Sequence, residues 1–68
     1  MNNLKALRYF VAVVDAGSFT AAATKISIAQ PALTRQIREL EESFGTQLLH
    51  RLARGVRMTA AGVTLYES

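Results

Sequence analysis

One stretch carries the strongest structural signals: Gln30-Pro31-Ala32-Leu33-Thr34-Arg35-Gln36-Ile37-Arg38. Proline is tolerated in the first turn of a helix, where its missing N–H would have no partner, so Pro31 indicates a helix start. Apolar side chains then recur at helical spacing, at Leu33, Ile37, Leu40 and Phe44. Gly45 can end the helix in a left-handed conformation. We therefore expect a helix that begins near Pro31 and ends at Gly45.

Two further helices are expected before this one. The first has an apolar stripe at helical spacing, formed by Leu4, Leu7, Val11 and Val14. Residues 15–18 interrupt the pattern, and Ser18 is a candidate N-cap for a second helix over residues 20–26. The middle of that helix is alanine-rich, which favours helix and permits close approach by a neighbour. A turn at residues 27–29 leads into the Pro31 helix.

After Gly45 the pattern changes from helical to extended. Segments 47–51 and 56–59 each indicate a short strand, and Gly55 between them can adopt the positive φ of a tight loop. Thr59 is a candidate N-cap for a last helix, from residue 60 to about residue 68. The predicted class is mainly α, a winged helix-turn-helix with a three-helix core and a small β-hairpin wing.

The outward face of the third helix has an unusual charge order. Arg35 and Arg38 occupy its first half, and the acids Glu39, Glu41 and Glu42 occupy its second half. The helix dipole favours the opposite order by roughly 0.3–1 kcal/mol per charge. Insertion of the first half into the major groove of DNA would explain this order, because the arginines would then meet phosphates or bases. A solvated face with surface ion pairs is an alternative that this helix alone leaves open.

Other side chains at the start of this helix suit base recognition. Gln30 can pair with two atoms of adenine, as arginine can with guanine. Thr34 can donate to a phosphate or contact a thymine methyl group, and Pro31 lies on the same outward face. We therefore treat the first half of the helix as a candidate DNA reader.

The hairpin concentrates three arginines, Arg51, Arg54 and Arg57. Arg54 stands beside Gly55 at the tip, where it could enter a narrow minor groove. Arg51 and Arg57 suit contacts with phosphates. An arginine-rich edge that discourages strand aggregation is the alternative interpretation.

Ser18 and Thr20 open the second helix. Its free N–H groups and dipole suit a DNA phosphate. A plain N-cap role for Ser18 is at least as good an interpretation, and the two roles can coexist.

Composition argues against several other classes of protein. The chain has 68 residues, a net charge of +3, no cysteine and one histidine, His50, so we expect one domain with no metal, cofactor or catalytic site. The longest apolar run, residues 9–14, is too short to span a membrane. The aromatic side chains lie on or beside apolar stripes and are expected in the core: Tyr9, Phe10, Phe19 and Phe44. We expect a soluble cytoplasmic protein.

Several linked motifs resemble the N-terminal DNA-binding domain of LysR-type transcriptional regulators. They are LRYF at 7–10, GSFTAAA at 17–23, IAQPALTRQI at 28–37, LE at 40–41, FG at 44–45, LLHR at 48–51, RGV at 54–56, Thr59 and Gly62. The resemblance implies a bacterial regulator, with a DNA-binding domain at 1–59 and the start of a linker helix at 60–68. The rest of the parent protein, including an effector domain, would lie beyond this chain.

The resemblance also implies partners and contacts. Family members act as homo-oligomers on inverted repeats in promoter DNA, so this chain would be nucleoid-associated when bound. Recognition contacts carried over by motif are Gln30, Pro31, Ala32, Thr34 and Arg35, with Arg54 as the wing contact. A winged-helix protein-interaction module that does not bind DNA is the alternative function.

Four positions depart from the family pattern. Ala29 stands where serine is common, so a side-chain cap is expected to be missing. Thr34 replaces a common serine, Leu49 a common phenylalanine, and residues 52–53 make the wing loop more apolar. These differences affect the expected base preference and not the fold.

Overall fold

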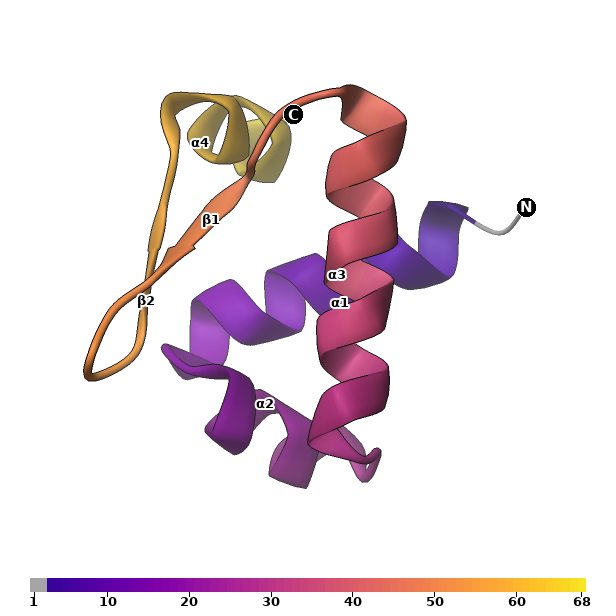
Figure 1. The fold of residues 1–68 in the computed structure, drawn as a ribbon, viewed down its shortest axis with the longest axis vertical. Coiled ribbons are helices and arrows are strands. Elements are labelled where there is room, and N and C mark those ends of the chain that lie inside the picture. Colours follow the sequence, from indigo (N-terminus) through magenta and orange to yellow (C-terminus); the bar gives the residue numbers. More distant parts are fainter. Residues whose placement is uncertain (1–2) are drawn as a thin grey trace.

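The computed structural model describes residues 3–68, which form four helices and one two-stranded hairpin (Figure 1). The elements are α1 (Asn3–Ala16), α2 (Phe19–Ile26), α3 (Gln30–Phe44), β1 (Leu49–Arg51), β2 (Val56–Met58) and α4 (Ala60–Glu67). Their order is the predicted one, and the mainly α class with a hairpin wing is confirmed. Residues 1 and 2 of the predicted domain lie outside the described residues.

The hydrophobic core lies among the first three helices and the start of the hairpin. Its buried members are Ala6, Phe10, Val13, Phe19, Ala22, Ala23, Leu33, Ile37, Leu40, Leu48 and Leu49. The expected burial of Phe10 and Phe19 is confirmed, and Tyr9 packs at the margin. The small side chains of Ala22 and Ala23 are buried, as close approach of a neighbouring helix requires.

Two expectations about apolar stripes were wrong. On α1 the buried face consists of Ala6, Phe10 and Val13, whereas Leu4 is 60% exposed and Val11 is 38% exposed. The large Phe10 ring, fully buried, turns the helix so that the predicted stripe lies partly at the edge. On α3 the stripe stops at Leu40, and Phe44 is 50% exposed because it is the last residue before Gly45 turns the chain away.

The helix ends follow local rules. The Ser18 hydroxyl accepts a hydrogen bond from the Ala21 N–H at 3.0 Å, so the predicted N-cap is confirmed, although α2 begins at Phe19, one residue earlier than expected. Ala29 gives α3 no side-chain cap, as its methyl group dictates. Gly45 ends α3 at φ 70°, in the left-handed region.

The two strands pair antiparallel, with His50 opposite Arg57. They are shorter than predicted: the Thr59 N–H still donates to the Leu48 carbonyl at 3.0 Å, but the Leu48 N–H bonds to the Glu41 carboxylate, and the Thr59 side chain caps α4. Its hydroxyl accepts from the Gly62 N–H at 3.0 Å and donates to the Gln47 carbonyl at 2.7 Å. The close packing of α4 on this segment needs Gly62, since a Cβ there would lie 2.1 Å from the Leu48 carbonyl oxygen.

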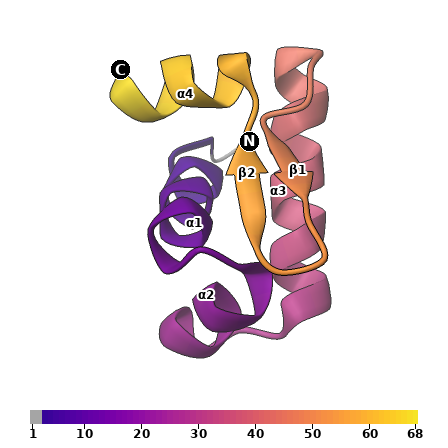
Figure 2. The same ribbon diagram turned by 90° about the vertical axis from the view of Figure 1, so that its left-hand side faces the viewer.

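The hairpin loop is held against the turn between α1 and α2 (Figure 2). The Val56 N–H donates to the Gly17 carbonyl at 3.1 Å. Gly55 has φ +97°, and a Cβ at this position would lie 2.6 Å from the same carbonyl oxygen. Glycine is therefore required both for the backbone conformation and for the contact that positions the wing.

Candidate nucleic-acid interface

The first half of α3 forms a continuous polar surface. Gln30, Pro31, Arg35 and Arg38 are exposed, and Thr34 is half-buried beside them. These five residues line one surface hollow of about 410 Å³. Ala32, also predicted as a contact, is half-buried and does not line it.

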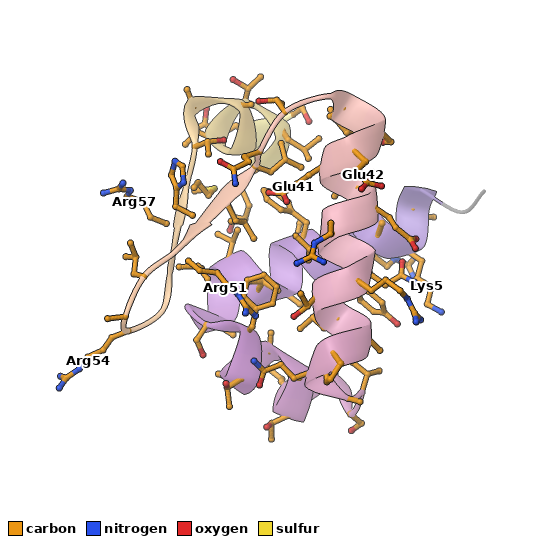
Figure 3. All side chains as sticks on the ribbon, in the orientation of Figure 1. Lys5, Glu41, Glu42, Arg51, Arg54 and Arg57 are labelled. Atoms are coloured by element: carbon orange, nitrogen blue, oxygen red, sulfur yellow. The ribbon has the colours of Figure 1, made fainter. Side chains whose placement is uncertain are left out.

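One of the three acids expected on the outward face does not belong to it. Glu41 is half-buried, and its Oε2 accepts hydrogen bonds from the N–H groups of Leu48 at 2.7 Å and Leu49 at 3.1 Å. Figure 3 shows its side chain between α3 and the hairpin. The turn after Gly45 brings these N–H groups back over the helix, and the carboxylate pairs with them. Its position four residues after Ile37 was the available signal, because that spacing places both residues on the same side of the helix.

The starts of α2 and α3 are joined by a side-chain hydrogen bond. The Thr20 hydroxyl donates to Oε1 of Gln30 at 3.0 Å. Ser18, Thr20 and Gln30 share a hollow of about 200 Å³ with Arg51 and Gly55 of the hairpin. Residues predicted separately on two helices and the wing therefore meet at one concave surface.

Arg51 differs from the other two arginines of the hairpin. Its guanidinium lies 3.9 Å from the centroid of the Phe19 ring, and its Nη2 donates to Oγ1 of Thr34 at 3.1 Å. In Figure 3 it reaches toward α3, whereas Arg54 and Arg57 extend away from the helices. Sequence reasoning missed these contacts, since Phe19 and Thr34 lie far from Arg51 along the chain and carry no local signal for it.

A larger groove runs between α3 and β1. Its volume is about 420 Å³, and Thr34, Arg38, Glu41, His50 and Arg51 contribute to its lining. His50 is exposed at this groove. Within residues 3–68, His, Cys, Asp and Glu side chains form no group of three that could hold a metal ion.

A side-chain hydrogen bond links α4 to α1. The Tyr66 hydroxyl donates to Oδ1 of Asp15 at 2.5 Å. This hydrogen bond, followed by the charge of Asp15 and partial burial, raises the pKa of Tyr66 above its usual 10.0.

Across residues 3–68 no single helix has the length and apolarity to cross a membrane, although α1 and α2 would qualify as a pair bent by 120°.

These features define a winged helix-turn-helix domain: α2 and α3 joined by a tight turn, and an arginine-bearing hairpin docked beside them. Residues 4–63 match the family model described as bacterial regulatory helix-turn-helix protein, lysR family. The match covers most of the chain, and the chain belongs to this family.

Similar proteins agree with this assignment. The HTH-type transcriptional regulator BenM of Acinetobacter baylyi is 56% identical over 64 residues, which are 94% of this chain and 21% of BenM. The regulator BudR of Raoultella terrigena is 54% identical over 63 residues, 93% of this chain and 22% of BudR. The chain therefore spans about a fifth of the length of these relatives, which are transcriptional regulators and not enzymes.

A solved structure matches nearly the whole chain. The crystal structure of the BenM DBD/catB site 1 DNA complex superposes with a TM-score of 0.91 at 55% identity, over 98% of this chain and 74% of that one. The winged helix-turn-helix class is thus confirmed.

Proposed function

We propose that this chain binds double-stranded DNA in a sequence-specific manner, as the DNA-binding domain of a bacterial transcriptional regulator. The observation that carries the proposal is the joining of three elements into one surface, where the starts of α2 and α3 and the wing share a hollow. The surface is rich in hydrogen-bond donors, and the backbone of DNA offers acceptors at every nucleotide.

In this arrangement α3 enters the major groove with its N-terminal half. Gln30 and Arg35 reach base edges, Pro31 and Ala32 make apolar contacts, and Arg38 meets a phosphate or a base. The exposed Glu39 and Glu42 stay outside the groove, where they do not approach phosphates.

The wing and α2 add contacts outside the major groove. Arg54 extends from the hairpin tip toward the minor groove, and Arg57 meets phosphate. One guanidinium N–H of Arg51 is bonded to Thr34, and its remaining N–H groups can donate to a phosphate. The N-terminus of α2, at Ser18 and Thr20, offers its free N–H groups to another phosphate.

The whole protein is proposed to act as a homo-oligomer on an inverted repeat in promoter DNA. The domain proper would end at residue 59, and α4 would begin the helix that links it to an effector domain. Structures of related DNA complexes support the DNA partner. We place the protein in the cytoplasm, associated with the nucleoid when bound.

A gel shift tests the proposal. A dimeric form of the chain is mixed with its own promoter fragment at physiological salt, and random-sequence DNA serves as competitor. Retention of the promoter complex against excess competitor is expected. Equal affinity for both DNAs would contradict sequence-specific binding, and no binding to either would favour the protein-interaction alternative.

A further inference from the structure

The hydrogen bond between Arg51 and Thr34 has a definite direction. A guanidinium carries five N–H donors and no acceptor, so Oγ1 of Thr34 must accept in this 3.1 Å contact. The hydroxyl proton of Thr34 therefore points away from Arg51. The stacking of the guanidinium on the Phe19 ring, 3.9 Å from its centroid, holds the donor in place.

The Thr34 proton also has no acceptor among residues 3–68. A helical threonine often donates to the carbonyl four residues earlier, as Thr64 does to Ala60 at 3.2 Å. Thr34 makes no such bond to Gln30, although it stands at the same spacing. Its proton is left for a partner outside the chain, at the hollow that Thr34 shares with Arg35 and Arg38.

We propose that Arg51 is a positioning residue that biases Thr34 toward donation: its guanidinium occupies one lone pair of Oγ1, and its positive charge disfavours a second donor there, so a base that presents an acceptor is favoured opposite Thr34. The inference rests on the proposed DNA binding. In the major groove, guanine O6 and N7, adenine N7 and thymine O4 are acceptors, whereas cytosine presents only the N4 donor. Thr34 thus favours thymine, guanine or adenine over cytosine at its base pair, and Arg51 maintains that preference from outside α3.

The experiment separates this role from a simple phosphate contact. A preferred site is first selected by the wild-type chain, in dimeric form, from a library of randomised duplexes. Thr34→Val, which keeps the shape of the side chain but removes the hydroxyl, is then measured on every single-base variant of that site. The base pair at which it loses discrimination is the one that faces Thr34.

At that base pair two duplexes are compared. If thymine is preferred, it is replaced by 5-methylcytosine opposite guanine, which keeps the methyl group but exchanges the O4 acceptor for an N4 donor. If a purine is preferred, the replacement is 7-deazaadenine opposite thymine, which presents the N6 donor and lacks the N7 acceptor. The readout is the ratio of the two Kd values for each protein. Because both values come from one preparation, the ratio is independent of the fraction of protein that is folded.

The variants are Arg51→Met, Thr34→Val, the double variant and Arg57→Met as matched control. Arg57 is also an exposed hairpin arginine, but it extends away from α3. The wild-type ratio is expected to be roughly tenfold, equivalent to about 1.4 kcal/mol. Arg51→Met should lower it to about threefold or less, Arg57→Met should leave it unchanged while weakening both duplexes, and the double variant should match Thr34→Val.

Two results would overturn the proposal, and a third would refute the function on which it rests. An unchanged ratio in Arg51→Met, with uniform weakening as in Arg57→Met, would make Arg51 a phosphate contact only. A ratio that survives Thr34→Val at every base pair would mean that Thr34 does not read a base. A wild-type chain that selects no site at all would instead refute the proposed function, on which the inference rests.

Discussion

The Glu41 carboxylate connects α3 to the hairpin through two backbone N–H groups, those of Leu48 and Leu49. A single acidic side chain therefore aligns the wing with α3. The equally acidic Glu42, next in the chain, is exposed. Neighbouring residues of one type thus have different roles because only one of them faces unpaired donors.

Glu41→Ala is expected to lower the free energy of unfolding by about 1–3 kcal/mol, because it leaves two hydrogen-bond donors without their partner. Glu42→Ala is the control and should change it by less than about 0.5 kcal/mol. Urea unfolding measures both. Equal effects of the two substitutions would show that the Glu41 hydrogen bonds do not stabilise the fold.

Arg35 is expected to contact a base. Arg35→Ala should weaken binding to the preferred site by about 1–3 kcal/mol and relax the preference at one position. Titration of single-base variants of that site measures this. A loss that is the same for every sequence would assign Arg35 to a phosphate.

At the scale of the elements, the hairpin depends on two glycines that allow backbones to approach closely. Gly55 lets the loop meet the Gly17 carbonyl, and Gly62 lets α4 pack on the Leu48 carbonyl. The position of Arg54 at the wing tip follows from the first of these contacts. Substitution of Gly55 therefore tests whether the position of the whole wing depends on this contact.

Gly55→Ala should destabilise the fold by more than the roughly 1–2 kcal/mol expected for a left-handed alanine alone. Its Cβ would lie 2.6 Å from the Gly17 oxygen. Gly45→Ala is the matched control, since Gly45 has φ +70° and a Cβ added there would meet no atom within 4 Å. Urea unfolding compares them, and faster amide exchange at Val56 should accompany Gly55→Ala. A smaller loss for Gly55→Ala than for Gly45→Ala would contradict the contact.

The hydrogen bond between α4 and α1 should lose its stabilising effect at alkaline pH. The raised pKa of Tyr66 means that the folded chain holds this proton more tightly than the unfolded chain does. Its contribution to stability is therefore complete below pH 10.0, the unfolded value, and is lost as the pH rises through the folded pKa. Tyr66→Phe should remove this part of the pH dependence. Unfolding curves of both proteins from pH 8 to pH 11 measure it, and parallel curves would contradict the expectation.

At the scale of the whole molecule, the chain has a net charge of +3, and five of its basic residues lie on α3 and the hairpin: Arg35, Arg38, Arg51, Arg54 and Arg57. Each phosphate neutralised by a lysine or arginine releases counterions. The strength of DNA binding should therefore fall steeply as the salt concentration increases.

Arg57→Ala should reduce the slope of log K against log salt by about 0.9, the value for one phosphate contact on duplex DNA. The slope is measured between 50 and 200 mM salt, a range over which such contacts respond strongly. Glu67→Ala, a change of one charge on α4, serves as control and should leave the slope unchanged. An Arg57→Ala slope equal to that of the wild type would remove Arg57 from the interface.

Most of the fold could be predicted from the sequence by itself. Helix periodicity, the Ser18 and Thr59 caps, Pro31 at a helix start and the glycines at 45 and 55 are local signals, and each acts within a few residues of its own position. The order of elements and the winged helix-turn-helix class follow from them. The candidate residues of the first half of α3 were also accessible in this way, because a helical wheel places side chains by spacing alone.

What only the tertiary structure decided depends on contacts between distant segments. The burial of Phe10 in place of Leu4 and Val11, the pairing of Glu41 with the hairpin, and the stacking of Arg51 on Phe19 all follow from how elements approach each other. No local pattern encodes such distances. The direction of the Thr34 hydrogen bond belongs to the same group, since it is set by an arginine seventeen residues away.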